Sequence, residues 1–194
     1  AERVVWLTQR GYDELVHCEM EHLATVPLSK LSMRAVLGCD NDRTAELLMQ
    51  HVPGRFAHAA HSVETLDGWS SITELATRHR LLNEWYRAIR LAGTSTVNLR
   101  DFTACVKGIR ESGLDVVRTL ASGIHKLNRS SGGREREFLD RWLDANLLMR
   151  IGTNMLLDQH LACTSVEAGG LGRPTGIIDT RCDALRVCKQ AALV

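Results

Sequence analysis

The sequence has little proline, no long hydrophobic run and no excess of one charge. Proline occurs only at positions 27, 53 and 174 of the 194 residues. No apolar stretch approaches the roughly 20 residues that a membrane-spanning helix needs, so we expect no membrane span. The 24 Lys and Arg residues are matched by 23 Asp and Glu residues, which leaves a net charge of +1. This balance offers no basic surface for nucleic acid, and we expect no nucleic-acid partner.

Paired cysteine motifs are also missing. The six cysteines stand at positions 18, 39, 105, 163, 182 and 188, and no two of them form a Cys-x-x-Cys pair. A helical domain of this size does not need disulfides to fold. We therefore expect reduced, mostly buried thiols in a reducing compartment. A disulfide or a zinc site is the less favoured interpretation.

Helical periodicity is the main pattern that the sequence does contain. Apolar residues recur every three or four positions rather than every second one, which is the period of an amphipathic helix. The clearest segments are at about 43–66, 70–91, 98–128 and 134–163. Shorter helices are expected near 9–24, 29–38 and 180–192. The pattern predicts an all-α fold, an antiparallel four-helix bundle with short flanking helices at both ends.

This pattern divides the chain into three parts. Residues 1–40 form an N-terminal helical segment, residues 41–165 the four-helix bundle, and residues 166–194 a linker and the start of a following segment. Pro53 should kink the first long helix, and Asp179 or Thr180 should cap the last short one. The linker contains a Gly-rich stretch, which could cradle a phosphate only if it followed a strand, so we interpret it as a hinge.

Three histidines and two glycines were weighed as candidate site residues. His51, His58 and His61 share one helix, and the last two are spaced to meet one metal ion. No Asp, Glu or Cys is expected beside them, so a solvated or core-edge pair is the favoured interpretation. Gly113 and Gly123 lie on the apolar stripe of the third long helix, where glycine is unfavourable. Each allows either close helix packing, which we favour, or room for a ligand.

Two arginines fall near the inner faces of the third and fourth long helices. Arg110 and Arg150 would each need a carboxylate or another anion as a partner at such a position. An internal ion pair with Asp115 or Asp144 is the simpler interpretation. A pocket for a small carboxylate is the alternative.

The fourth long helix carries a recognisable pattern, Trp142–Ile151 followed by Met155–His160. Its order of aromatic, Leu-Asp, Arg-Ile, Met-Leu and Gln-His resembles a stretch of the mitochondrial dehydrogenase kinases, the family of the pyruvate and branched-chain 2-oxoacid dehydrogenase kinases. Further segments that resemble the family in the same order are Leu31–Arg34, Val52–Arg55, Trp85–Tyr86, Asp115–Ile124, and Gly176–Asp179 with Cys182. The resemblance covers about residues 28–190.

The resemblance implies a helical bundle that docks onto a multi-subunit dehydrogenase complex of the mitochondrial matrix and binds small carboxylate regulators. In the family a separate C-terminal domain binds ATP and Mg²⁺ and phosphorylates a serine of the dehydrogenase. Because this chain stops at Val194, where that domain should begin, we expect no cofactor and no protein Ser/Thr kinase activity in the chain as given. Arg110, Arg150 and Tyr86 match positions of the family's regulator pocket.

The chain departs from the family pattern at four positions. Gly113 stands where the family has a histidine that supports the catalytic carboxylate, so no catalytic residue is expected here. Ser112 replaces the arginine that precedes that histidine, and Asn154 replaces a second regulator-binding arginine. Val36 replaces an aromatic residue of the lipoyl-binding region, which argues against lipoyl binding.

Three functions therefore compete. The first is the regulatory and docking half of a dehydrogenase kinase. The second is a pseudoenzyme, a degenerate kinase-like bundle that serves as an accessory or structural subunit of a large mitochondrial complex. The third is a helical interaction module unrelated to kinases.

Overall fold

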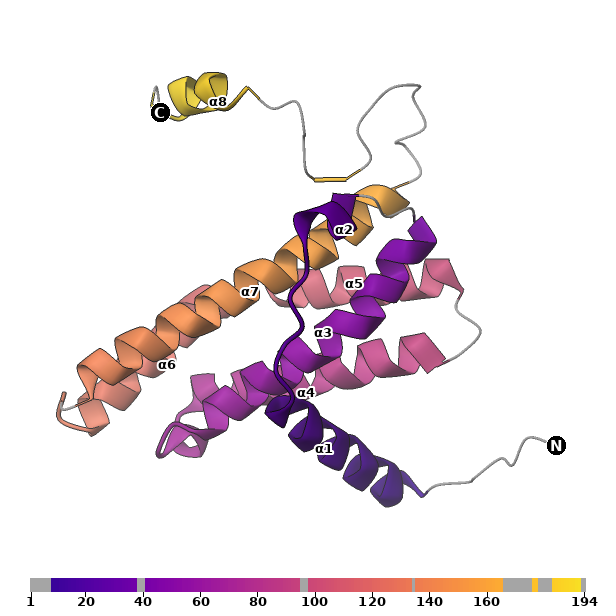
Figure 1. Ribbon diagram of the computed structural model, residues 1–194. Helices are drawn as coiled ribbons and strands as arrows, with labels where there is room; N and C mark the ends of the chain where they lie inside the picture. The colour runs from indigo at the N-terminus through magenta and orange to yellow at the C-terminus, as the bar shows by residue number, and fades with distance from the viewer. Residues whose placement is uncertain are drawn as a thin grey trace.

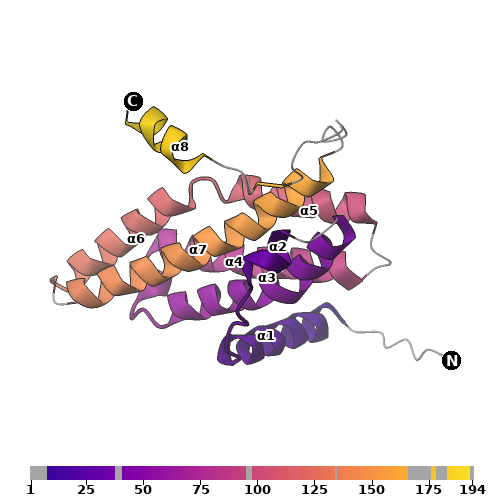
Figure 2. The same cartoon turned by 45° about the horizontal axis from the view of Figure 1, so that its top comes forward.

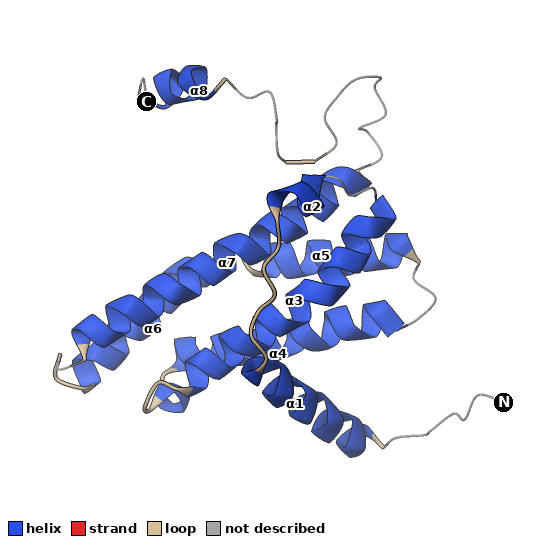
Figure 3. Cartoon of the chain, viewed as in Figure 1, coloured by secondary structure: helices blue, strands red, loops and turns tan. Residues whose placement is uncertain are grey.

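The described part of the chain consists of helices joined by turns and loops. The structure is a computed structural model, and it describes residues 8–37, 41–94, 98–133, 135–165, 176–177 and 183–192. The helices are α1 (Gln9–Thr25), α2 (Met33–Leu37), α3 (Asn41–Glu64), α4 (Thr73–Thr94), α5 (Leu99–Ser112), α6 (Val116–Ser130), α7 (Arg136–Thr164) and α8 (Ala184–Ala191), with a 3-10 turn at Trp69–Ser71. No strand occurs among these residues, as Figure 3 shows, which confirms the all-α prediction.

The long helices pack in a few pairs. Helix α3 lies against both α4 and α7, α4 lies against α5 and α6, and α7 lies against α5 and α6 (Figures 1 and 2). Helix α1 packs on the outer side of α3. In both views α8 stands apart from the other helices. None of the described helices is long and apolar enough to cross a membrane.

The expected third long helix is in fact two helices, α5 and α6. The helix stops at Ser112, and a turn at residues 113–115 separates it from α6. Gly113 adopts φ −88° and ψ −2°, and its carbonyl accepts a turn hydrogen bond from the amide of Val116. Both α5 and α6 bury an apolar face against α4 and α7, so the three-or-four spacing of apolar residues continues across the turn. Periodicity alone therefore did not reveal the break. A glycine inside the pattern was the warning, since glycine is a weak helix former.

Local signals explain where several helices begin. The Thr8 hydroxyl accepts a hydrogen bond from the amide of Gly11 at the start of α1, and the Asn98 side chain accepts one from the amide of Arg100 at the start of α5. Helix α3 continues on both sides of Pro53. The expected caps of the last helix, at 179 and 180, lie outside the described residues.

The core consists of two clusters of buried apolar residues. The larger one lies between α1, α3, α4, α5 and α7, and it includes Val52, Phe56, Leu82, Trp85, Ile109 and Leu157. The smaller one, called the apolar end below, consists of Val63, Leu66, Leu75, Leu120, Ile124, Leu127, Leu139 and Trp142.

The cysteines are less buried than the sequence suggested. Cys163 is buried and Cys105 half-buried, but Cys18 and Cys188 are exposed, and none of these four forms a disulfide. Cys18 is exposed because α1 buries only one face, through Val16 and Met20. The other two cysteines lie outside the described residues.

Candidate functional site

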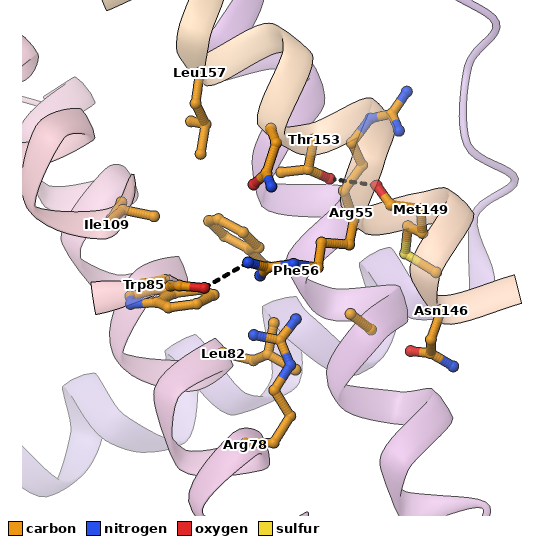
Figure 4. Close-up of a pocket in the computed structure, with 14 residues that line it drawn as sticks. Arg55, Phe56, Arg78, Leu82, Trp85, Ile109, Asn146, Met149, Thr153 and Leu157 are labelled. Carbon is orange, nitrogen blue, oxygen red and sulfur yellow. Dashed lines mark hydrogen bonds between the residues drawn. The ribbon is translucent and has the colours of Figure 1, made fainter. Parts of the chain in front are cut away.

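A cavity opens where α3, α4 and α7 meet the turn between α5 and α6 (Figure 4). We call it the arginine cavity; the residues that line it include Arg55, Arg78, Trp85, Gly113, Arg150 and Asn154. Its volume is about 20 Å³. Since a single water molecule needs roughly 10–15 Å³ of such space, the cavity admits a small polar group.

Arg150 enters the arginine cavity from α7. Its Nη2 atom donates a hydrogen bond of 2.5 Å to the carbonyl oxygen of Gly113. That carbonyl lies in the turn, so the break between α5 and α6 supplies an acceptor that a continuous helix would have used internally. Burial, and then the charge of Arg110, lower the pKa of Arg150. A cation held in this way favours an anion beside it.

Arg78 enters the cavity from α4. Its side chain points toward the space between Trp85 and Asn146 in Figure 4. Its guanidinium carbon lies 5.1 Å from the centre of the Trp85 ring, a cation–π contact. Its Nη1 atom is buried and has no hydrogen-bond partner among the described residues. Burial, and then the charge of Arg150, lower the pKa of Arg78 to about 9.

Arg55 completes the set from α3. A Cβ atom added at Gly152 would lie 3.0 Å from its Nη1 atom, so Gly152 leaves the space that this guanidinium occupies. Burial lowers the pKa of Arg55. No hydrogen bond or ion pair joins Arg55 to another described residue. The three guanidinium groups therefore share one cavity, to which no described Asp or Glu contributes.

The carboxylate of Asp158, on α7, is already engaged by Arg110. Asp158 accepts two hydrogen bonds from Arg110, of 2.7 and 3.2 Å. Such bidentate pairs are strong, so Asp158 neutralises Arg110 and not the arginines of the cavity. The cavity thus keeps a positive charge that an anion from solution could balance.

The ion pairs expected from the sequence were assigned to the wrong partners. Arg110 pairs with Asp158 rather than with Asp115 or Asp144. Asp115 instead bonds to Arg118 at 2.6 Å on the surface. The reason is the helix break, which places Asp115 at the exposed start of α6 and not in line with Arg110.

Tyr86 does not line the arginine cavity. Its side chain is fully buried between α4 and α1, and its hydroxyl makes no hydrogen bond of ordinary geometry. Burial, followed by the nearby Glu19, raises the pKa of that hydroxyl. The structure therefore brings Arg150 and Gly113 together, with Arg110 close by, and Tyr86 is not among the residues that line the cavity.

Sequence reasoning missed Arg55 and Arg78 as cavity residues. Arg55 was noticed only as part of a family-like segment. Arg78 had a usable signal, because it follows Leu75 by three positions and precedes Leu82 by four. That spacing places a charged residue on the apolar stripe of α4, where an arginine needs an explanation.

The remaining candidates have ordinary structural roles. His58 contacts the carbonyl of Val26 at 2.7 Å, and His51 contacts the Ser29 hydroxyl at 3.1 Å. His61 lies 3.5 Å from Glu64, three positions along the same helix, so the expectation of no acidic neighbour was wrong. Among the described residues no group of three His, Cys, Asp or Glu side chains could hold a metal ion.

The two glycines on the apolar stripe have different surroundings. A Cβ atom at Gly123 would lie 3.0 Å from Leu75, so this glycine allows close packing of α6 on α4, as expected. Gly113 lines the arginine cavity, and a Cβ atom there would lie 3.4 Å from the Trp85 ring. Only Gly113 therefore leaves room at the candidate site.

Comparisons with known proteins match this chain to one family. Residues 31–179 match the family model described as mitochondrial branched-chain alpha-ketoacid dehydrogenase kinase. The chain is 27% identical over 192 residues to the mitochondrial pyruvate dehydrogenase (acetyl-transferring) kinase isozyme 4 of Ictidomys tridecemlineatus, covering 91% of this chain and 46% of the relative. The Homo sapiens isozyme 4 is also 27% identical, over 194 residues and the same shares.

A plant relative gives a similar result. The mitochondrial pyruvate dehydrogenase (acetyl-transferring) kinase of Arabidopsis thaliana is 26% identical over 158 residues, 77% of this chain and 41% of the relative. The chain spans about half the length of the curated relatives that it matches.

Proposed function

We propose, on the premise that this chain belongs to the mitochondrial branched-chain alpha-ketoacid dehydrogenase kinase family, that its arginine cavity binds a small carboxylate regulator such as a 2-oxo acid. The observation that supports this most is the set of three arginines, Arg55, Arg78 and Arg150, without a carboxylate among the described lining residues. Partly buried cations that lie close together repel one another, and an anion between them removes that repulsion.

The proposed regulator would act by linking helices. Its carboxylate would accept hydrogen bonds from Arg150 on α7 and stand next to the turn that ends at Asp115. Arg78 on α4 would supply a second cation. A ligand that binds only the folded state stabilises it by mass action, so occupancy would tighten the packing of α4, α7 and the α5–α6 turn.

The family membership supports a wider proposal for the whole protein. The chain is a regulatory helical domain related to mitochondrial dehydrogenase kinases. We infer that it docks onto a mitochondrial complex, a 2-oxoacid dehydrogenase complex in the matrix, and that it is not catalytic by itself. ATP and Mg²⁺ would bind a separate domain of a longer protein.

The division of the chain into 1–40, 41–165 and 166–194 belongs to the same proposal. So does the description of its centre as an antiparallel four-helix bundle, in which α5 and α6 together take the third position.

Gly113 favours a second candidate function, that of an accessory subunit derived from a kinase. The family resemblance places at this position a histidine that supports the catalytic carboxylate, and glycine offers no side chain to replace it. In that case the arginine cavity would still bind a regulator, but the protein would lack kinase activity even if a nucleotide-binding domain followed.

The first test is thermal unfolding of the 194-residue chain with 2-oxoisovalerate or pyruvate at up to about 10 mM. We expect the ligand to raise the melting temperature, and Arg150→Ala to abolish the shift, because the variant loses the cation on α7. Lys107→Ala is a matched control, since Lys107 is exposed and pairs with Glu111 on the surface of α5. It should keep the full shift.

The same assay tests the absence of catalysis in this chain. Millimolar Mg-ATP should leave the melting temperature unchanged, because the nucleotide would bind elsewhere. A shift with Mg-ATP would contradict the non-catalytic assignment. No shift with any 2-oxo acid would contradict the regulator site.

A further inference from the structure

We propose that Arg78 makes the arginine cavity selective for a compact dianion, such as a short dicarboxylate or hydrogen phosphate, over a monocarboxylate. This inference rests on the proposed function, because it concerns the ligand of the same cavity. It gives Arg78 a role in ligand specificity. Neither the ion pairs expected from the sequence nor the family resemblance involved this residue.

The first argument is the number of charges. A monocarboxylate bound at Arg150 would balance one positive charge. Arg78 would then remain next to Arg150, and the charge of Arg150 already disfavours the charged form of Arg78. A second negative charge on the ligand would remove this repulsion, because opposite charges in a partly buried site attract strongly.

The second argument is the unused donor. The Nη1 atom of Arg78 is buried, has no hydrogen-bond partner among the described residues, and belongs to a side chain that points into the cavity (Figure 4). Buried polar groups are nearly always hydrogen-bonded, so an unpaired guanidinium nitrogen marks a missing acceptor. The acceptors around the cavity are engaged elsewhere: the Asn146 Oδ1 atom accepts a hydrogen bond from the Ser62 hydroxyl at 3.0 Å, and the Gly113 carbonyl accepts one from Arg150.

The third argument is that a purely structural role does not explain Arg78. The contact with Trp85 provides some stabilisation, but a methionine would pack on the same ring without a desolvated charge. An arginine at an apolar-stripe position of α4 is therefore better explained by a ligand than by packing.

The size of the cavity limits the ligand. With about 20 Å³ the cavity has space for one or two water-sized groups before side chains move. Its walls on the inner side are Phe56, Leu82 and Leu157. Phosphate and malonate are both larger than this space, so either one requires the lining side chains to move outward. An anion whose two charges are close together requires the smallest movement, which disfavours a long dicarboxylate.

The test is isothermal titration calorimetry with malonate, inorganic phosphate and pyruvate as separate probes, at pH 7.5 and constant ionic strength. The wild-type chain should bind malonate or phosphate at least tenfold more tightly than pyruvate. Arg78→Met should weaken binding of the preferred dianion at least tenfold and that of pyruvate less than threefold. Whichever of malonate and phosphate binds more tightly identifies the class, dicarboxylate or phosphate.

Two further variants keep the test decisive. Arg78→Lys preserves the charge and should retain part of the selectivity, which also covers the case in which Arg78→Met does not fold. Arg80→Met removes an exposed arginine of the same helix that pairs with Glu84. It should change each affinity less than twofold. If Arg80→Met weakened dianion binding as much as Arg78→Met does, the effect would come from the net charge of the protein, and the proposal would be overturned.

The outcomes separate this inference from the proposed function. Pyruvate binding at least as tightly as both dianions would overturn the role of Arg78 and leave the regulator site intact. No binding of any of the three probes would overturn both.

Discussion

The two ends of the helical core, built largely from the same helices, differ in charge and in packing. The apolar end joins α3, α4, α6 and α7 through residues such as Leu75, Leu120 and Trp142, and Gly123 brings α6 into close contact with Leu75. The arginine cavity joins α3, α4 and α7 to the α5–α6 turn and contains three guanidinium groups. One end is thus packed for stability, and the other keeps a small charged space.

The difference shows which part of the core is explained by folding alone. Close-packed apolar side chains stabilise a fold without further partners. Unpaired buried charges do the opposite, because desolvation disfavours them. The arginine cavity is therefore the part of the core that needs a function to explain it. The predictions below test this contrast, beginning with the largest effect.

Removing side-chain volume from the apolar end should have the largest effect on stability. Leu75 has no exposed surface, so Leu75→Ala should lower the free energy of unfolding by about 2–5 kcal/mol, through lost burial and a cavity. Urea unfolding measures this loss. Leu15→Ala is the control, because Leu15 is 57% exposed, and it should change stability by less than about 0.5 kcal/mol. A loss below about 1 kcal/mol for Leu75→Ala would mean that the apolar end is not tightly packed.

The free energy of unfolding should depend on pH because of one buried histidine, His160. His160 is fully buried between the Thr44 and Thr103 hydroxyls, 3.0 Å from each, and its ring meets Phe102 edge-on at 5.3 Å. Burial lowers the pKa of His160 from 6.5 to about 4. Between these two pH values the unfolded chain binds a proton that the folded chain does not.

Stability should consequently fall as the pH drops from about 6.5 to about 4, by up to roughly 3 kcal/mol. Urea unfolding at several pH values measures it. His160→Gln can still bond to the two hydroxyls but does not titrate, so its stability should depend less on pH across this range. An identical pH profile for both proteins would exclude His160 as the cause.

The smallest effects come from a matched pair of glycines. Gly108 in α5 has no neighbouring atom within 4 Å of an added Cβ, so Gly108→Ala should raise the free energy of unfolding by about 0.5–1 kcal/mol through helix propensity. At Gly123 the same Cβ would lie 3.0 Å from two Leu75 atoms, so Gly123→Ala should lower it by about 1 kcal/mol or more. Thermal unfolding gives both signs, and equal signs would contradict the close packing of the apolar end.

Much of the fold follows from the sequence, because helical period and breaks are local properties. The apolar residues spaced by three or four positions from Leu48 to Val63 of α3, and Leu66 just after it, are buried. The boundaries of α3, α4 and α7 are close to those predicted. The break at Gly113 was missed, because two helices that bury the same side continue one period. The buried face of a long helix is harder to predict than its bounds: Phe138 of α7 is 46% exposed while the next residue, Leu139, is buried, because successive residues are rotated by about 100° around the helix axis.

The site was predicted less well than the fold. Arg150 and Gly113 could be recognised from the family resemblance, whereas Arg78 and the partner of Arg110 could not. Ion-pair partners depend on how helices are rotated and spaced in three dimensions, and Asp158 meets Arg110 only through the packing of α7 on α5. Tyr86 shows the same limit, because neighbouring positions on α4 point to different sides of the helix.

The central claim is that the arginine cavity binds a small carboxylate, and chemical-shift mapping by NMR with 2-oxoisovalerate tests it most directly. The amides of residues 109–115 and 146–154 should shift, together with the indole N–H of Trp85, which donates to the Ser112 hydroxyl at 3.0 Å. The amides around Leu120 and Leu127 at the apolar end should not. No shifts, or shifts concentrated at the apolar end, would contradict the account.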